Sequence, residues 1–390
     1  MRICFICGEY PPGPHGGIGT MTQTLGRSLT RLGHDVRVIG VYPRSYPAPN
    51  FEVDEGVRIW RLRERRTSGS WMFTRRRLFK EVEKWVLAGD VDVVEVPDYQ
   101  GWAAGWGKLN VPVIGRLHGS VTYFAAELGR PTDRVSFWLE RASVRRFDYI
   151  CSVSEYTSRK SHQVFKLDCR KSHTILYNPV EMVTESSSVP RSENLVVFSG
   201  TLTGKKGIVS LIEAWPTVVN SYPNAELHVF GKDGRTDDGE SMQGFLSARL
   251  NGTSASVRFH GHVSREKLFE ALRTARAAVF PSYAEAFAIA PLEAMACGCP
   301  TIYSRQGSGP EMMEDGREGL LIDPHQPGQI ADAILNILSN PTFARQIGDA
   351  GRNRIRQQFS IDSLVNQNID FYQQCINGFR LRHRKGIPAA

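Results

Sequence analysis

Two carboxylates eight positions apart, Glu285 and Glu293, stand in the stretch PSYAEAFAIAPLEAMACG at residues 281–298. The apolar run 277–282 predicts a buried parallel strand, and the Ala, Leu, Glu and Met residues after it predict a helix that ends at Gly298. Glu285 then lies in the connecting loop and Glu293 inside the helix. Because a helix N-terminus attracts phosphate, the pair would flank an anion site and grip the hydroxyls of a phosphate-containing ligand. In the alternative, Glu285 caps the helix and Glu293 is a solvated surface residue.

A glycine-rich loop, PPGPHGGIGT, follows the first expected strand at residues 2–7. Gly16, Gly17 and Gly19 would let a ligand approach the backbone closely. The loop lacks the complete G-x-G-x-x-G spacing of a dinucleotide-binding motif, and no acidic residue closes the second strand. A tight turn therefore explains the loop as well as a binding site does.

Three further side chains follow strand ends. His118 comes directly after the expected strand 111–117, and Lys205 and Lys206 follow the expected strand 195–200. A histidine in this place is either structural or turned toward a ligand. The lysines precede a helix, where cations oppose the helix dipole, which favours contact with an anion over a solvated helix start.

The elements that must position these residues alternate along the chain. Expected strands in the first half are 2–7, 35–41, 57–62, 92–96, 111–117 and 149–154, and those in the second half are 195–200, 225–231, 257–261, 277–282 and 300–304. Strands that alternate with helices predict an α/β fold with parallel sheets. At 390 residues the chain has room for two doubly wound, Rossmann-like domains, each with ligand loops at the carboxyl ends of its strands.

The domain boundaries are expected at changes of composition. We expect an N-terminal domain over 1–180, a polar linker over 181–194 and a C-terminal domain over 195–358. A last amphipathic helix over 359–378 is expected to pack back toward the N-terminal domain, followed by a basic, disordered tail over 379–390.

The net charge of +8 is unevenly distributed, because residues 1–180 hold 27 Lys and Arg against 18 Asp and Glu. The basic side chains gather at Arg61, Arg63, Arg65, Arg66, Arg75, Arg76, Arg77 and Lys80. This basic cluster indicates either an anionic acceptor or anionic membrane surface, or else a solvated face. Nucleic acid is not expected as a partner, since no nucleic-acid-binding motif accompanies the charge.

Several classes of protein are excluded by composition. The sequence contains no run of eighteen apolar residues, so we expect no membrane-spanning helix. The apolar run at the N-terminus is too short for a secretory signal, and we expect a first strand there instead. The seven cysteines form no paired set with zinc-ligand spacing, so we expect buried thiols in a reducing compartment and no metal site. The expected location is cytoplasmic, with peripheral contact at the inner face of the membrane if the basic cluster binds lipid.

The segment 281–298 resembles the E-x7-E signature of retaining GT-B glycosyltransferases, in particular glycosyltransferase family 4 (glycosyl transferases group 1). The resemblance covers roughly residues 1–375, is strongest over 195–325 and is weakest over 42–110. Other runs that match the family in sequence and position are GGIG (16–19), HG (118–119), SVSEYT (152–157), ILYNPV (175–180), SGTLTGKKGI (199–208), HGHV (260–263), GSGPE (307–311) and GLLID (319–323).

The resemblance implies a GT-B fold, in which the N-terminal domain binds the acceptor and the C-terminal domain binds a nucleotide sugar across a cleft. It implies retaining transfer of a hexose-type sugar from a nucleoside-diphosphate sugar, with UDP favoured, to a carbohydrate, lipid-linked or small-molecule acceptor, and no metal cofactor. Glu285 and His118 would act at the reacting sugar. The donor-binding positions would be Gly16, Gly17, Lys205, Lys206, Val263, Phe287, Ala288, Ile289 and Glu293.

Three positions bear on specificity and activity. Asp98 and Tyr99 follow a strand end beside several tryptophans, and we expect them to contact the acceptor. Thr201 stands where the family carries an arginine that neutralises the leaving diphosphate, and Lys205 is the neighbouring cation that would compensate. A GT-B-fold nucleotide-sugar epimerase and an inactive nucleotide-sugar-binding homologue are the alternatives.

Overall fold

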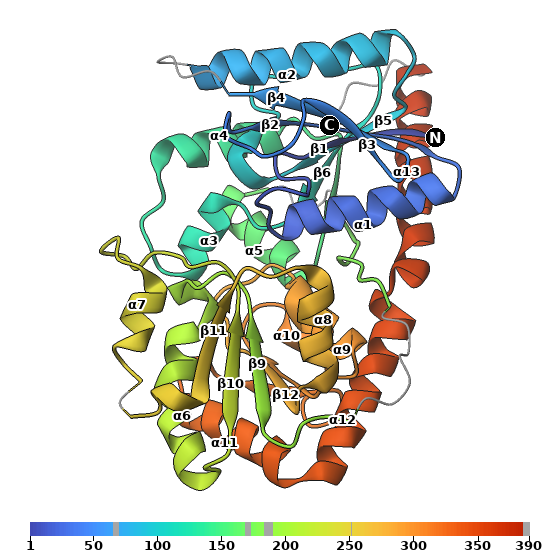
Figure 1. The fold of residues 1–390 in the computed structure, drawn as a ribbon. Coiled ribbons are helices and arrows are strands. Elements are labelled where there is room, and N and C mark those ends of the chain that lie inside the picture. The colour runs from blue at the N-terminus through green and yellow to red at the C-terminus, as the bar shows by residue number, and fades with distance from the viewer. Residues whose placement is uncertain (65–69, 168–172, 183–189, 251, 385–390) are drawn as a thin grey trace. The chain divides into compact units, whose positions relative to one another are not determined.

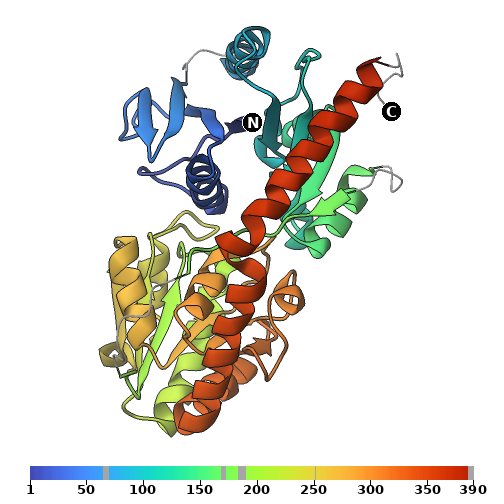
Figure 2. The same cartoon turned by 90° about the vertical axis from the view of Figure 1, so that its right-hand side faces the viewer.

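The computed structural model describes residues 1–64, 70–167, 173–182, 190–250 and 252–384. The chain forms two compact units (Figures 1 and 2). The N-terminal unit comprises Met1–Pro179 and Ile361–Ala390, and the C-terminal unit comprises Val180–Ser360. Residues 183–189 of the expected linker lie outside the described part of the chain.

The N-terminal unit has an eight-stranded sheet in which one pair, β3–β4, is antiparallel. In spatial order its strands are β3 (Phe51–Asp54), β4 (Val57–Arg63), β2 (Asp35–Tyr42), β1 (Arg2–Ile6), β5 (Val93–Pro97), β6 (Val113–Leu117), β7 (Tyr149–Ser152) and β8 (His173–Ile175). The six expected strands are all present. The sequence did not predict β3 and β8, because a four-residue edge strand that alternates exposed and half-buried residues and a three-residue strand carry no apolar pattern.

Helices cover both faces of this sheet. Cys4 and Ile6 of β1 belong to the same apolar cluster as Leu78 of α2, whereas the ring of Phe5 contacts that of Tyr372 in α13. Since neighbouring strand residues point to opposite faces, α2 and α13 lie on opposite sides. The helices of this unit are α1 (Gly17–Arg31), α2 (Ser70–Leu87), α3 (Val121–Glu127), α4 (Arg134–Val144), α5 (Glu155–Phe165) and α13 (Ile361–Arg384).

A buried polar network fastens α13 to the sheet. The guanidinium of Arg116 on β6 donates to both carboxylate oxygens of Glu95 on β5, at 2.8 and 2.9 Å, and to Asn368 Oδ1 at 2.6 Å. The hydroxyl of Tyr372 donates to Glu95 at 2.7 Å. The last helix is therefore built into the N-terminal unit through a paired and hydrogen-bonded buried charge.

The expectation of a disordered tail from residue 379 is wrong for its first residues, because α13 continues to Arg384. Phe379 is buried, and the guanidinium of Arg382 lies over the ring of Tyr149, 4.6 Å from its centroid. These contacts extend the helix past the point at which its apolar pattern weakens.

The C-terminal unit has a six-stranded, fully parallel sheet. Its spatial order is β11 (Val257–Gly261), β10 (Glu226–Phe230), β9 (Leu195–Ser199), β12 (Ala277–Phe280), β13 (Thr301–Ser304) and β14 (Leu320–Ile322). Helices α6 (Ile208–Ser221) and α11 (Pro327–Ser339) pack together against one face, and α8 (Arg265–Thr274) and α9 (Ile289–Ala296) lie on the other (Figure 1). The expected pair of doubly wound domains is confirmed. Among the described residues, no helix combines the length and apolar character needed to cross a bilayer.

Candidate nucleotide-sugar and acceptor sites

The lysine loop and the loop that follows β12 meet in the C-terminal unit. Gly207 has φ 69°, and a Cβ there would lie 1.7 Å from the carbonyl oxygen of Pro281, so only glycine permits this approach. The carbonyl oxygen of Lys205 accepts a hydrogen bond from the Tyr283 amide at 2.8 Å. Nζ of Lys206 then forms an ion pair with Oε1 of Glu285. Three of the expected site residues are thus brought together.

The charges of this cluster depend on one another. Burial alone would raise the pKa of the Glu285 carboxyl, but Lys206 and Lys205 outweigh burial and lower it. Burial lowers the pKa of the Lys205 ammonium, an effect that the charge of Glu285 opposes. Glu285 is therefore ionised at neutral pH, in a setting where cations already balance one negative charge.

Glu293 is not a solvated surface residue, because it is 9% exposed within α9. Its Oε1 lies 3.2 Å from the guanidinium of Arg265, which also pairs with Glu181 at 2.8 Å. Burial raises the pKa of Glu293, and Arg265 opposes this shift. No sequence pattern singles out Arg265, since a residue at the start of α8 carries no sign of its contact with Glu293 on α9, 28 positions away.

The N-terminal end of α9 carries the remaining donor-binding positions. Ala288 is the N-cap residue and Ile289 the first helical residue, and the N-cap residue itself makes no side-chain capping hydrogen bond. The first amides of a helix have no carbonyl partner within it, so this end suits an anion. Val263 is half-buried in the loop before α8, and Thr201 is exposed.

The glycine-rich loop of the N-terminal unit holds a carboxylate of its own. Gly16 is the N-cap of α1 and Gly17 its first residue. The amide of Gly19 donates to Oε1 of Glu9 at 2.9 Å, and a Cβ on Gly16 would lie 3.3 Å from the same oxygen. A phosphate at this end of α1 would meet a negative charge. The contact of Gly16 and Gly17 with the donor stays a prediction.

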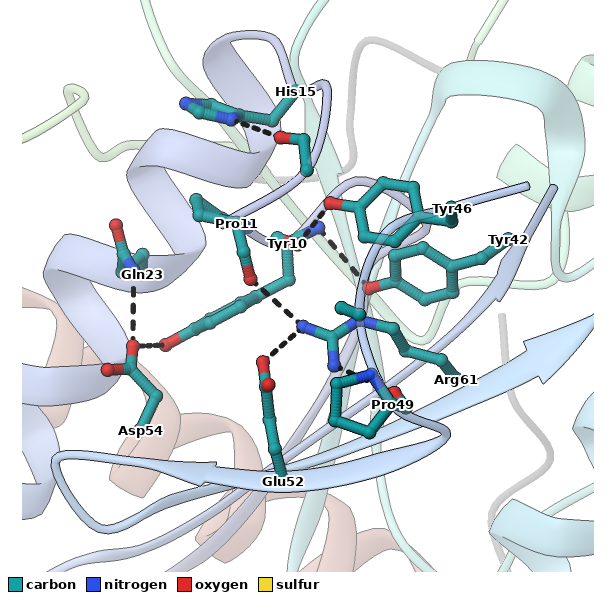
Figure 3. Close-up of polar contacts among 12 residues, drawn as sticks. Tyr10, Pro11, His15, Gln23, Tyr42, Tyr46, Pro49, Glu52, Asp54 and Arg61 are labelled. Atoms are coloured by element: carbon teal, nitrogen blue, oxygen red, sulfur yellow. Dashed lines mark hydrogen bonds and ion pairs between the residues drawn. The ribbon is translucent and has the colours of Figure 1, made fainter. Parts of the chain in front are cut away.

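Part of the expected basic cluster is internal structure rather than surface (Figure 3). The side chain of Arg61 is fully buried, pairs with Glu52, and donates to the carbonyl oxygens of Pro11 at 2.9 Å and Pro49 at 3.1 Å. Its guanidinium lies 5.7 Å from the ring centroid of Tyr46. Arg61 thereby fixes the glycine-rich loop against the segment that follows β2.

Two more arginines of the cluster hold backbone in place. Arg63 donates to the carbonyl oxygens of Pro43 and Tyr46, both at 3.1 Å. Arg75 donates to the carbonyl oxygens of Gln100 and Gly101, and packs over the ring of Trp102. Of the described members of the cluster, those left exposed are Arg76, Arg77 and Lys80. A membrane contact stays a prediction that rests on these three.

The same loops enclose a pocket of about 340 Å³ within the N-terminal unit. Its walls come from the segments after β1, β2, β4 and β5, which are the carboxyl ends of parallel strands, where α/β sheets bind ligands. Glu9, Tyr46, Glu64, Tyr99 and Trp102 are among the residues that line it. Tyr99, an expected acceptor contact, is thus at a pocket wall.

Asp98 and His118 form a buried pair beside this pocket wall. The amide of His118 donates to Oδ1 of Asp98 at 2.8 Å, and Asp98 is fully buried. Burial and the charge of Arg116 lower the pKa of His118 well below its usual range, so the imidazole is neutral at pH 7. Burial raises the pKa of Asp98 to about 8. His118 follows the strand end as expected, but it is 8% exposed rather than open to solvent.

Glu140 on α4 joins the two strand-end loops. Its carboxylate accepts from the amides of Gln100 at 3.1 Å, Val121 at 2.9 Å and Thr122 at 3.0 Å. No sequence pattern singles out Glu140, because a glutamate in an amphipathic helix is expected to be solvated. It is completely buried, and it fixes both the Tyr99 segment and the His118 segment.

Comparison with known proteins identifies the class. The family model of Glycosyltransferase Family 4 matches residues 15–182, and that of Glycosyl transferases group 1 matches residues 182–354. An uncharacterised glycosyltransferase of Methanocaldococcus jannaschii is 27% identical, over 96% of this chain and 98% of its own.

Solved structures agree in fold. A sucrose-phosphate synthase from Thermosynechococcus elongatus superposes with a TM-score of 0.80 at 22% identity, over 96% of this chain and 99% of its own. Alr3699/HepE of Anabaena, solved in complex with UDP and glucose, has a TM-score of 0.72 at 14% identity, over 96% of this chain and 100% of its own. The architecture is the GT-B fold. The chain belongs to glycosyltransferase family 4, whose members transfer sugars from nucleotide-sugar donors.

Proposed function

We propose that this protein transfers a hexose-type sugar from a UDP-sugar to a carbohydrate, lipid-linked or small-molecule acceptor, with retention of configuration at the anomeric carbon. The observation that carries the proposal is the cluster of Lys205, Lys206 and Glu285, whose glutamate lies in the loop just before the first turn of α9. A structural neighbour solved with UDP supports the choice of base.

In this proposal the diphosphate binds at the first turn of α9. The amides of Phe287, Ala288 and Ile289 and the ammonium groups of Lys205 and Lys206 stabilise the charge that develops as the nucleoside diphosphate departs. Lys205 supplies the second cation that the family draws from an arginine, because Thr201 carries no charge. No metal ion is required in this scheme.

Two carboxylates hold hydroxyl groups on either side of the diphosphate. Glu293, oriented by Arg265, accepts hydrogen bonds from the ribose hydroxyls. Glu285 binds hydroxyls of the donor sugar and stabilises positive charge near the anomeric carbon. Reaction on the front face of the sugar, with the leaving phosphate accepting the acceptor's proton, gives retention without a covalent intermediate. The neutral His118 serves as a hydrogen-bonding group near the donor sugar rather than as a charge.

Incubation with a panel of nucleotide sugars, with and without sugar acceptors, tests the proposal. We expect UDP to be released only when an acceptor is present. NMR of the product should show the same axial or equatorial linkage at the anomeric carbon as in the donor. A new sugar nucleotide formed without acceptor would instead identify an epimerase. Binding of nucleotide sugars without turnover across the panel would identify an inactive homologue.

Replacement of Glu285 by Gln is expected to lower kcat at least about 100-fold, because the neutral amide cannot stabilise positive charge at the sugar. The same change removes the partner of Lys206, so the Kd for UDP should stay the same or fall. Glu213→Gln, at an exposed position on α6, is the matched control and should leave both quantities unchanged. Near-normal turnover by the Glu285 variant would remove its proposed role.

A further inference from the structure

The pocket of the N-terminal unit differs in charge from the half of the chain that forms it. Residues 1–180 carry an excess of basic side chains, yet the charged residues that line the pocket in the described part of the chain are Glu9 and Glu64. Arg61, Arg63 and Arg75 lie behind the walls and are engaged by backbone carbonyls. The charged side chains in this lining are therefore carboxylates, which repel anions.

Glu9 occupies the place where an anion would otherwise bind. Its carboxylate accepts from the Gly19 amide at 2.9 Å, so it already compensates the positive end of the α1 dipole. A phosphate entering this end of the pocket would have to displace it or lie against it. A hydroxyl group, in contrast, can donate to a carboxylate oxygen and form a charge-assisted hydrogen bond.

The segment that follows β5 adds aromatic side chains to the pocket lining. Tyr99 and Trp102 flank Gln100, whose φ of 61° is unusual for a residue other than glycine. This conformation is fixed by Glu140, which accepts from the Gln100 amide, and by Arg75, which donates to its carbonyl oxygen. The proximity of Glu9 contributes to a raised pKa of the Tyr99 hydroxyl, after burial. Phenolic and indole rings combine an apolar face with a polar group, which suits a sugar, whose faces are apolar and whose edges carry hydroxyls.

We propose that this pocket binds the acceptor, that the acceptor is a sugar or polyol without negative charge, and that Glu9 and Glu64 select it by accepting hydrogen bonds from its hydroxyls. This inference rests on the proposed function, since it names the acceptor of the same reaction. Sugar phosphates and uronic acids whose anionic group would lie in the pocket are therefore not expected to be acceptors.

Saturation-transfer NMR on the full chain, with saturating UDP present, tests binding without requiring transfer. The probes are glucose, maltose and myo-inositol, each paired with its monophosphate. At least one neutral probe is expected to give a signal, and its monophosphate should bind at least about tenfold more weakly. Glu9→Gln and Glu64→Gln each remove a hydrogen bond to a charged group, so each should weaken binding of the neutral probe about tenfold. Glu83→Gln on α2, outside the pocket lining, is the matched control and should bind as wild type.

The outcomes separate this inference from the proposed function. Tighter binding of the phosphates, absence of any neutral signal, or wild-type binding by both pocket variants would overturn the inference. Thermal melts of the variants, expected to match wild type, show that a loss of signal is not a loss of fold. Binding of a neutral sugar by a chain that turns over no nucleotide sugar would leave the inference standing and overturn the proposed function instead.

Discussion

At the scale of single residues, the site is organised by carboxylates whose partners differ. Glu285 is balanced by lysines, Glu293 by an arginine, and Glu9 by a helix amide. The first two are therefore suited to a ligand that brings its own charge and hydroxyls, whereas the third disfavours an anion. The E-x7-E spacing predicted the first two positions, but no spacing rule reveals which cation each one meets.

Asp98 provides a test of stability at this scale. Its pKa, raised by burial from 3.8 to about 8, means that the folded state holds a proton that the unfolded state releases near pH 4. The stability linked to this proton is complete below pH 4 and is lost as the pH rises through 8. Asp98→Asn keeps an acceptor for the His118 amide and has no proton to lose. Between pH 5 and 8 the melting temperature of the wild type should fall by at least about 2 °C more than that of this variant.

The control for this measurement is Asp332→Asn, at an exposed position on α11, which should follow the wild-type curve. Parallel curves for wild type and Asp98→Asn would mean that the carboxyl is ionised in the folded protein.

At the scale of elements, short loops at strand ends are positioned by side chains from helices and strands distant in sequence. Arg61 on β4 holds the glycine-rich loop, Glu140 on α4 holds two strand-end turns, and Arg116 on β6 holds α13. The basic cluster, interpreted from sequence as surface, therefore partly serves to shape the pocket. Charged residues within otherwise apolar strands, such as Glu95 and Arg116, were the available signal for the network under α13.

The attachment of α13 can be tested by breaking its ion pair. Glu95→Ala leaves Arg116 buried without its carboxylate and should destabilise the N-terminal unit by about 3–5 kcal/mol. Tyr372→Phe removes only one hydroxyl of the network and should cost about 1 kcal/mol. Denaturant unfolding gives these values, and hydrogen exchange should show faster exchange of α13 amides in the first variant. Equal effects of the two changes would argue that the ion pair does not anchor the helix.

At the scale of the whole molecule, the sequence predicted two Rossmann-like domains and all eleven of the strands named from it, because buried parallel strands are continuous apolar runs. The edge strands β3, β8 and β14 and the last turns of α13 escaped prediction, since their stability comes from tertiary contacts rather than from local pattern. The order of the motifs along the chain predicted the family, but the charge of the acceptor pocket depends on which side chains line it and emerged only from the structure.

The proposed function requires that the C-terminal unit bind the donor's diphosphate at the start of α9. A crystal structure of the protein with UDP is the decisive measurement. We expect the diphosphate within hydrogen-bonding distance of the amides of Phe287–Ile289 and of the ammonium group of Lys205 or Lys206, with the ribose hydroxyls on Glu293. UDP bound at any other place, with residues 285–293 left without contact to it, would overturn the proposed function.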